Sequence, residues 1–381
     1  MKINSYKFAV KSKSESFWIE QTKLGSINLF GGLSGVGKTR LLNTIYNLSL
    51  IIQKNKKLLL GSWKIDFSID KKNYKYTLDL KKSPNSGNVF INKEILIENE
   101  KKLIERNGSI FKFDNRPLPK LSQEDIGIFL LREEPKIKNV FSEFKKIYIR
   151  RFNPDYYHKD LKEQIVGFSK EILTLKKEKF TLEYIHENNN FSDVNSQLYL
   201  LKQYHNDVFL EIESDFKEIF PFVEKIDVRP INEVKEMEVS SLPIDTFIPI
   251  LLIKEKKVKE WIPVLRISSG MMRAVIQLVD VYTMPKNSIY LIDEIENSMG
   301  IRSLPVMLDI LFKFSKKIQF IFTTHHAYIF NNVDVKYWKV LTRDGSHIKV
   351  IDGTVLKENF SKSYQDAYIQ LLNSDMIENG I

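Results

Sequence analysis

The 381-residue sequence contains no cysteine, which excludes disulfide bonds and thiolate metal sites. It also lacks long apolar runs, since Phe247–Ile253 is far shorter than the roughly 20 residues that a membrane-spanning helix needs. The first residues, MKINSYKFAV, do not show the basic and then apolar order of a signal peptide. We therefore expect a cytoplasmic protein with no membrane partner.

Internal repeats, low-complexity segments and linkers rich in proline or glycine are absent as well. The composition is that of a globular protein, with 43% hydrophobic residues and a formal net charge of +10. Part of this charge lies in three lysine-rich runs, Lys54–Lys57, Lys176–Lys179 and Lys254–Lys259. Such runs attract nucleic acid phosphates, but they also occur on solvated faces, and aromatic residues are not interleaved with them here. Nucleic acid therefore stays open as a partner.

The apolar pattern predicts an α/β fold in three consecutive segments, 1–157, 158–222 and 223–381. The middle segment is expected to be a short helical lobe, interrupted at Asn188–Asn190. From about residue 260 the chain alternates apolar helix and apolar strand, which is typical of a mainly parallel sheet. The helical lobe has apolar stripes at Leu161, Ile165, Phe168, Ile172, Leu175, Leu198, Leu201, Val208 and Ile212.

Within the first segment, two strands are expected before a Gly-rich turn, the second ending in Ser26–Phe30. A β-hairpin with its turn at Asp70–Asn73 and a strand at Phe144–Phe152 follow. In the last segment, a hairpin turns at Asp344–Gly345 and a short helix covers Gln365–Ile377. The helix after the Gly-rich turn has an apolar face made of Leu41, Ile45, Leu48 and Ile52.

The Gly-rich turn, Gly32–Thr39, matches the pattern G-x-x-x-x-G-K-[ST] between an expected strand and an expected helix. Glycines let backbone N–H groups curl around a phosphate, and the helix N-terminus adds partial positive charge. Lys38 would reach the β- and γ-phosphates, and the Thr39 hydroxyl would coordinate Mg²⁺. The alternative is a chance glycine-rich turn. The motif predicts ATP binding by Gly32, Ser34, Gly35, Val36, Gly37, Lys38, Thr39 and Arg40.

An acidic pair follows the apolar strand Ser288–Ile292. Asp293 suits ligation of Mg²⁺, and Glu294 suits orientation or deprotonation of an attacking water. The pair lies far beyond the P-loop in the chain, whereas small GTPases and ring-forming AAA+ motors carry their acidic strand much sooner. Both of those classes are therefore disfavoured.

A second anion-binding helix start is expected at Arg266–Arg273 (RISSGMMR), shortly before the acidic strand. Ser268 or Ser269 is a suitable N-cap. Because the P-loop already binds one nucleotide, Ser269 and Gly270 can cap the γ-phosphate held by a second copy. A plain helix cap is the alternative for this tripeptide alone. Its place between the P-loop and the acidic strand favours the functional interpretation.

The last motif is Thr323–His326 (TTHH), after the strand Ile318–Phe322. A histidine at the end of a strand beside the acidic strand can hydrogen-bond the γ-phosphate and the attacking water, and His325 is the better candidate. A metal site is disfavoured, because the chain has six histidines and no cysteine. A surface loop is the remaining alternative.

These four motifs, in this order, resemble the ABC-type ATPase head of the OLD (overcoming lysogenization defect), RecF and SMC-like group. The resemblance implies a P-loop NTPase fold, with a mixed sheet, an antiparallel β subdomain and a short helical lobe. It also implies a head-to-tail homodimer around two ATP molecules, in which Lys38, Thr39 and Asp293 act in cis and Ser269 and Gly270 in trans.

Other parts of the chain refine this resemblance. Glu294–Met299 resembles the dimer-facing D-loop of stand-alone ATPases in bacterial anti-phage defence operons. The segment Ile267–Met271 departs from the transporter signature L-S-G-G-Q, which argues against a transporter subunit. No glutamine of this sequence is identified as that of the family's Q-loop. The strand end at Arg150–Arg151 is the candidate for the position that this glutamine occupies.

The leading functional prediction is a sensor or gating ATPase of an anti-phage defence complex that controls a separate effector, such as a nuclease or toxin encoded nearby. OLD nucleases carry a TOPRIM domain after the ATPase head, and we expect no such module here, because few residues follow the Asp344–Gly345 hairpin. One alternative is a RecF-like DNA-repair ATPase. Another is a nucleotide-gated scaffold that holds a toxin or nuclease.

Overall fold

The computed structural model describes residues 1–12, 16–84, 86–151, 179–187, 194–234 and 248–356. Its contacts group the chain into two compact units. The first unit comprises 1–151, 287–295 and 315–381, and the second unit comprises 152–286 and 296–314. The two units are thus interleaved along the chain. The division into three consecutive segments stays a prediction.

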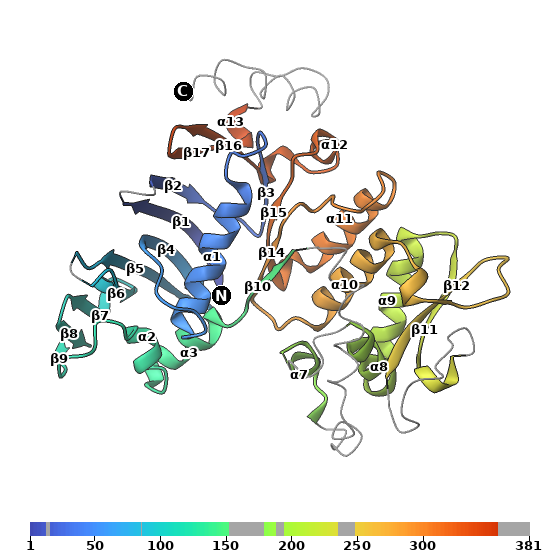
Figure 1. The fold of residues 1–381 in the computed structure, drawn as a ribbon, viewed down its shortest axis with the longest axis horizontal. Helices are drawn as coiled ribbons and strands as arrows, with labels where there is room; N and C mark the ends of the chain where they lie inside the picture. Colours follow the sequence, from blue (N-terminus) through green and yellow to red (C-terminus); the bar gives the residue numbers. More distant parts are fainter. Residues whose placement is uncertain (13–15, 85, 152–178, 188–193, 235–247, 357–381) are drawn as a thin grey trace. The chain divides into compact units, whose positions relative to one another are not determined.

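The first unit is built, within the described residues, on one 14-stranded mixed sheet (Figure 1). Along this sheet the strand order is β10-β14-β15-β3-β16-β17-β2-β1-β4-β5-β6-β7-β8-β9. The strands are β1 (Lys2–Lys11), β2 (Ser16–Lys23), β3 (Ile27–Gly31), β4 (Gly61–Ile69), β5 (Lys72–Lys82), β6 (Val89–Glu98), β7 (Lys101–Asn107), β8 (Ile110–Phe113), β9 (Arg116–Pro117), β10 (Ile147–Arg150), β14 (Ser288–Ile292), β15 (Ile318–Thr323), β16 (Trp338–Asp344) and β17 (His347–Asp352). The helices of this unit are α1 (Lys38–Ile52), α2 (Gly127–Leu130), α3 (Pro135–Phe144), α12 (Ala327–Phe330), α13 (Gly353–Leu356) and the 3-10 turn η6 (Val335–Tyr337).

The sheet has a parallel part and an antiparallel part. Strands β10, β14, β15, β3 and β16 pair in parallel, whereas β2, β1 and β4 to β9 pair as antiparallel neighbours. Strands β3, β14 and β15 are buried along their whole length, which explains their uninterrupted apolar sequences. The expected α/β fold, with a mixed sheet and an antiparallel β subdomain, is confirmed.

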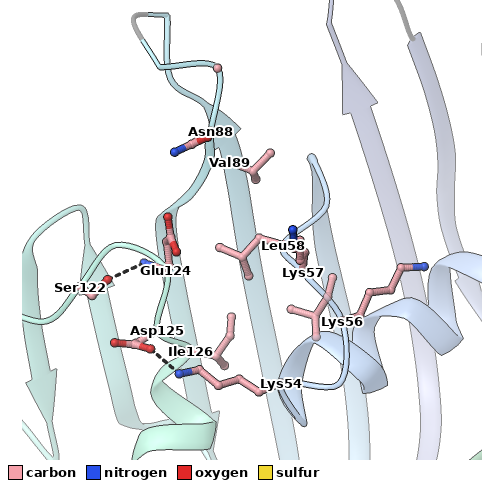
Figure 2. Close-up of a pocket in the computed structure, with 12 residues that line it drawn as sticks. Lys54, Lys56, Lys57, Leu58, Asn88, Val89, Ser122, Glu124, Asp125 and Ile126 are labelled. Carbon is pink, nitrogen blue, oxygen red and sulfur yellow. Dashed lines mark hydrogen bonds and ion pairs between the residues drawn. The ribbon is translucent and has the colours of Figure 1, made fainter.

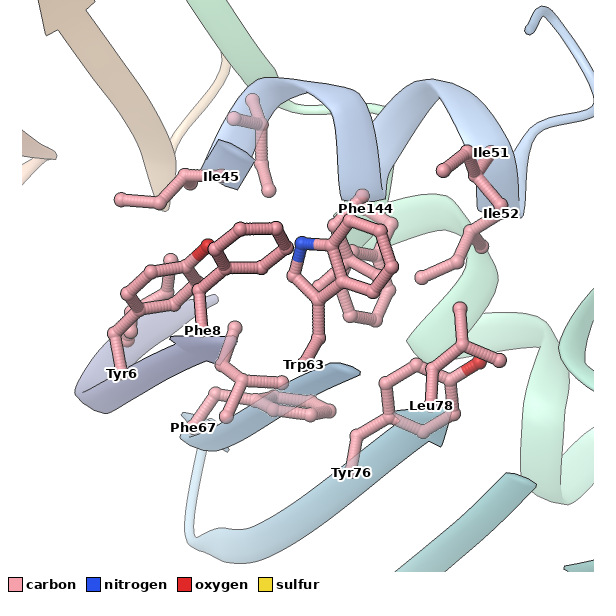
Figure 3. Packing of buried hydrophobic residues seen from close by; sticks show 14 of the residues in the cluster. Tyr6, Phe8, Ile45, Ile51, Ile52, Trp63, Phe67, Tyr76, Leu78 and Phe144 are labelled. Atoms are coloured by element: carbon pink, nitrogen blue, oxygen red, sulfur yellow. The ribbon is translucent and has the colours of Figure 1, made fainter. Parts of the chain in front are cut away.

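Helix α1 packs its apolar face onto the antiparallel strands (Figure 3). The four residues predicted for this face are at most 1% exposed. Trp63 of β4 reaches the helix and donates its indole N–H to the carbonyl of Thr44 at 3.0 Å. The Tyr6 hydroxyl of β1 donates to the Thr44 hydroxyl oxygen at 2.7 Å. These bonds pair the buried polar atoms of the aromatic residues and hold the helix that follows the P-loop.

The structure corrects two details of the predicted strands. Three strands, rather than two, precede the P-loop, because β1 and β2 form an antiparallel pair before β3. The strand expected at Phe144–Phe152 is shorter, since Phe144 ends α3 and β10 covers Ile147–Arg150. The structure adds strands β6 to β9, which the apolar pattern does not predict. The hairpins around Asp70–Asn73 and Asp344–Gly345 are confirmed.

The second unit combines helices with a small sheet. Helix α9 contacts α8, α10 and α11, and the Tyr282 hydroxyl of α10 donates to Asp215 of α9 at 3.0 Å. Its elements are α7 (Leu182–Glu187), α8 (Val194–Tyr204), α9 (Asn206–Ile219), β11 (Val223–Pro230), η3 (Ile231–Glu233), β12 (Pro249–Glu255), β13 (Ile262–Pro263), η4 (Val264–Arg266), α10 (Ser269–Thr283) and α11 (Ser303–Lys313), with η5 (Phe314–Lys316) at its end.

Part of the predicted helical lobe can be compared with the structure. Leu198, Leu201 and Ile212 are buried on α8 and α9, as the stripe predicts, whereas Val208 of the same stripe is only partly buried. The two helices are separated at His205. The stripe from Leu161 to Leu175, the break at Asn188–Asn190 and the C-terminal helix lie outside the described residues. No described helix is long and apolar enough to cross a membrane.

A buried polar cluster fixes one segment to the antiparallel strands. Glu94 of β6 accepts the backbone N–H of Gly127 at 2.7 Å. Arg106 of β7, which is 1% exposed, donates to the carbonyls of Ser122 and Asp125 at 2.7 and 2.6 Å. Burial raises the pKa of the Glu94 carboxyl, with the backbone bonds opposing this shift. The two side chains therefore position the segment between β9 and α2.

The substitution Arg106→Met is expected to lower the free energy of unfolding by about 3–5 kcal/mol. It leaves the Ser122 and Asp125 carbonyls without their donor and Glu94 without its neighbouring positive charge. Urea denaturation followed by tryptophan fluorescence measures this, because buried Trp63 lies in the same unit. Arg116→Met, at an exposed residue of β9, is the control. Equal urea midpoints for the two variants would contradict the role given to Arg106.

Candidate functional site

The P-loop has a backbone that only glycine fits at two positions. Gly32 and Gly37 have φ angles of 142° and 110°. A Cβ atom on Gly32 would lie 2.6 Å from the carbonyl oxygen of Leu341, and one on Gly37 would lie 2.5 Å from Cδ1 of Ile348. The loop is therefore pressed against β16 and β17 where α1 begins.

The Lys38 side chain folds back into this loop. Its Nζ donates to the carbonyls of Gly32 and Leu33 at 2.8 and 3.0 Å, and the residue is 7% exposed. Ser34 and Gly35 are exposed at the outer part of the loop. A buried ammonium at the first residue of a helix is suited to a phosphate, which supplies the negative charge and the acceptor oxygens.

Arg40, the last predicted nucleotide contact of the P-loop, lies over an aromatic ring. Its guanidinium carbon is 3.6 Å from the centroid of Phe17, which is buried in β2. Burial and the nearby positive charge of Arg343 lower the pKa of Arg40. Arg343 itself donates to the carbonyl of Gly35 at 3.1 Å. Two arginines therefore flank the P-loop and add positive charge beside the predicted phosphate position.

The two predicted Mg²⁺ ligands lie together. The Thr39 hydroxyl donates to Oδ1 of Asp293 at 3.1 Å, although the residues are far apart in the chain. Adjacent oxygen ligands of an octahedral Mg²⁺ are about 3 Å apart, given metal–oxygen distances near 2.1 Å. The described residues hold no cluster of three or more His, Cys, Asp or Glu suited to a metal ion. The pair therefore fits a Mg²⁺ completed by phosphate oxygens and water.

The predicted catalytic residues also meet in the first unit. Nδ1 of His325 is 3.8 Å from Oε1 of Glu294, and both side chains are partly exposed. His326 instead caps α12, since its Nδ1 accepts the backbone N–H of Tyr328 at 3.3 Å. A carboxylate and an imidazole at this distance can together orient one water molecule and move its proton. The sequence motif carried no separate signal for Thr323, whose hydroxyl bonds both Asp293 and Glu294.

The predicted signature segment lies in the second unit, at the start of α10. Ser268 is the N-cap, and its Oγ accepts the backbone N–H of Met271 at 3.3 Å. A Cβ atom on Gly270 would lie 2.3 Å from the carbonyl oxygen of Ser298. Gly270 thus allows close packing against the expected D-loop, while Ser268 and Ser269 remain accessible to solvent. An accessible helix N-terminus is suited to an anionic group.

The strand end considered for the Q-loop lies beside the acidic strand. Strand β10 pairs in parallel with β14, so that Arg150 is opposite Ile292. The backbone N–H of Asp293 donates to the carbonyl of Arg150 at 3.2 Å. Arg151 donates to the side chain of Asn43 on α1. The strand end therefore lies next to Asp293, as that interpretation requires, and it brings arginine rather than glutamine.

A separate hollow of about 600 Å³ lies where α1 ends (Figure 2). Lys54 lies on one side and forms an ion pair with Asp125 on the other at 2.6 Å. Lys56 donates to Asn47 at 2.8 Å, and Lys57 also lines the hollow. Part of the first lysine-rich run thus forms a defined surface feature. Most of the second run lies outside the described residues.

The sheet, the P-loop before α1 and the acidic residues after β14 together define an ABC-type P-loop ATPase fold. Comparison with known sequences adds nothing to this assignment, since no protein-family model and no curated protein matches the chain.

The solved structures that this chain is similar to include SMC head domains. The SMC head bound to the C-winged helix domain of ScpA has a TM-score of 0.52 and 12% sequence identity, covering 92% of this chain and 98% of that one. The SMC head domain from Thermotoga maritima has a TM-score of 0.45 and 11% identity, covering 92% and 99%. The head with an extended coiled coil from Pyrococcus furiosus, also bound to ScpA, has a TM-score of 0.45 and 11% identity, covering 98% and 99%. The first of these likenesses shows that the chain has the fold of an SMC head.

Proposed function

We propose that this protein is an ABC-type ATPase that hydrolyses ATP as a head-to-tail homodimer. The observation that carries the proposal is the grouping of Lys38, Thr39, Asp293, Glu294 and His325 in the first unit. These side chains supply a phosphate-binding ammonium, two Mg²⁺ ligands, and a base and histidine for the attacking water. In this proposal the group supplies the cis contacts to the phosphate, the Mg²⁺ and the attacking water.

Exposed apolar residues adjoin, in the chain, the motifs that would contact a second copy. Leu33 of the P-loop is 47% exposed. In the second unit, Leu265 and Ile301, which flank the signature helix start and the expected D-loop in the chain, are 40% and 59% exposed. In the proposed dimer, the second copy contacts the motifs that these exposed side chains adjoin in the chain.

The test of this proposal is the concentration dependence of ATP turnover. If two copies complete each site, specific activity rises with protein concentration until the dimer is saturated, and it requires Mg²⁺. A specific activity that is constant at all concentrations, with a monomer in the presence of ATP, contradicts the shared site. The absence of Mg²⁺-dependent hydrolysis contradicts the ATPase itself.

Within this proposal the ATPase is the sensor or gate of an anti-phage defence complex, and its dimer controls a separate effector protein. The resemblance of Glu294–Met299 to the D-loop of stand-alone defence ATPases supports this role. A nuclease or toxin that co-purifies with the chain and is released on ATP hydrolysis is the expected result. A partner that stays restrained by a variant without hydrolysis would instead favour a nucleotide-gated scaffold.

One observation favours a second candidate, a RecF-like ATPase that acts on DNA. The hollow at the end of α1 is lined by Lys54, Lys56 and Lys57 together with the acidic residues Glu124 and Asp125, and Lys54 is paired with Asp125. Lysines arranged in this way can neutralise backbone phosphates, and binding then weakens as salt rises.

The double substitution Lys56→Gln and Lys57→Gln tests DNA binding. If both lysines contact phosphates, the slope of log K against log salt becomes shallower by about 1.8 for double-stranded DNA. Fluorescence anisotropy at several salt concentrations measures this slope. Lys225→Gln, an exposed change in β11, serves as the control. An unchanged slope in the double variant would show that Lys56 and Lys57 do not contact DNA phosphates, so that the hollow would no longer support a DNA-binding function.

A further inference from the structure

We infer that Thr323 is a positioning residue, which holds the metal ligand Asp293 and the proposed base Glu294 in one fixed arrangement. Its hydroxyl donates to Oδ1 of Asp293 at 2.6 Å and accepts the backbone N–H of Glu294 at 2.8 Å. The residue ends β15 and is completely buried. This inference rests on the proposed ATPase function and assigns the threonine a task within it.

The direction of both hydrogen bonds follows from chemistry. A backbone N–H only donates and an ionised carboxylate only accepts, so a group between them must accept one bond and donate the other. A hydroxyl does both with a single oxygen atom. Serine can form both hydrogen bonds. Valine has the shape of threonine but can form neither of them. The role therefore belongs to the hydroxyl oxygen of Thr323 rather than to its bulk.

The backbone of Glu294 needs such support. Its φ angle is 50°, in the left-handed region, which costs a residue other than glycine about 1–3 kcal/mol. Thr323 binds both sides of this turn, because its Oγ1 accepts the N–H of Glu294 and its carbonyl accepts the N–H of Ile295 at 3.0 Å. The turn brings the Glu294 carboxylate to 3.8 Å from His325. Thr323 thus stabilises the strained peptide that carries the proposed base.

The same hydroxyl orients the predicted metal ligand. Oδ1 of Asp293 accepts bonds from Thr323 at 2.6 Å and from Thr39 at 3.1 Å. The Thr323 bond restrains rotation of the carboxylate, and Oδ1 is therefore kept toward the P-loop hydroxyl. Hydrogen bonds to ligating carboxylates commonly change metal affinity or activity about 10- to 100-fold when they are removed.

The experiment compares Thr323→Val with Thr323→Ser in the full chain. We expect Thr323→Val to lower kcat about 10- to 100-fold and to weaken Mn²⁺ binding in the presence of ATP, measured by electron paramagnetic resonance. ATP affinity in the absence of metal is expected to stay near that of the wild type, because the P-loop itself is unchanged. Thr323→Ser keeps the hydroxyl, so we expect it to restore both kcat and Mn²⁺ binding.

Thr342→Val is a matched control in the same sheet. Thr342 is 1% exposed on β16, and its hydroxyl oxygen has no hydrogen-bond partner in the described part of the chain. Removing that hydroxyl should leave kcat and Mn²⁺ binding as in the wild type. Thermal unfolding of all three variants shows whether a loss of function reflects a loss of fold.

Two results would overturn the inference. In the first, Thr323→Val hydrolyses ATP and binds Mn²⁺ like the wild type. In the second, Thr323→Ser is as impaired as Thr323→Val, so that the methyl group rather than the hydroxyl matters. A wild type without ATPase activity would contradict the proposed function alone, because the effect of Thr323 on Mn²⁺ binding with ATP is still measured.

Discussion

Glu294→Gln is expected to lower ATP turnover by about 10²- to 10⁴-fold and to leave ATP binding intact. The amide cannot accept a proton from the attacking water, whereas the binding groups Lys38 and Thr39 remain in place. Glutamine has the size of glutamate and can keep the left-handed backbone at this position. The loss should therefore fall on kcat and not on the nucleotide dissociation constant.

The same variant is expected to accumulate as a dimer when ATP is present. If ATP joins two copies and hydrolysis separates them, blocking hydrolysis keeps the joined state populated. Size-exclusion chromatography with ATP and Mg²⁺, compared with ADP, measures this change.

The control for both measurements is Glu133→Gln, whose side chain is 79% exposed between α2 and α3. If Glu294→Gln hydrolyses ATP at the wild-type rate, Glu294 is not the catalytic base. A monomer in every nucleotide state would count against the ATP-joined dimer.

Ser269→Arg is expected to abolish turnover, because an arginine side chain at the start of α10 blocks the approach of this helix to a second nucleotide site. ATP binding by the monomer should persist, since the P-loop belongs to the first unit and Ser269 to the second. Titration of a fluorescent ATP analogue at low protein concentration measures that binding. Loss of binding by the monomer would mean that the signature segment is structural.

Mixing two inactive variants gives a sharper test of the shared site. In a heterodimer of Ser269→Arg and Glu294→Gln, one site combines an intact base with an intact signature, and the other site carries both changes. Random mixing before ATP is added should restore at most about a quarter of wild-type activity for independent sites in a symmetric dimer, and less where the blocked second site weakens the heterodimer. A mixture that forms the heterodimer on size-exclusion chromatography and is as inactive as its components would contradict catalysis in trans by Ser269.

Local patterns in the sequence predict much of this fold. The helix after the P-loop and the strand Ser288–Ile292 are correct because each depends on its own periodicity and flanking residues. The sequence leaves two serines as candidates for the N-cap of α10, and the hydrogen bond from the N–H of Met271 identifies Ser268. Strands β6 to β9 do not follow from the sequence pattern, because strand pairing depends on neighbouring strands that a periodicity cannot show.

In the candidate site, sequence patterns predict individual residues but not the contacts between them. Thr39 and Asp293 each belong to a recognisable motif, but only the fold brings their oxygens to 3.1 Å. Thr323 belongs to the TTHH motif, but that motif predicts a function only for its histidines. A threonine at the end of an apolar strand does not by itself indicate any function. Its two hydrogen bonds depend on the register of β14 beside β15 and on the turn at Glu294.

The interleaving of the two units determines how the protein can be dissected. The stretch 287–295, which includes Asp293 and Glu294, is joined to the second unit by a peptide bond at each end. A single cut in the chain therefore releases neither unit as one continuous polypeptide, and truncation cannot isolate the nucleotide-binding half from the signature-bearing half. One of these peptide bonds joins Ile295 to Glu296, so a cut that separates the two units falls within two residues of Glu294.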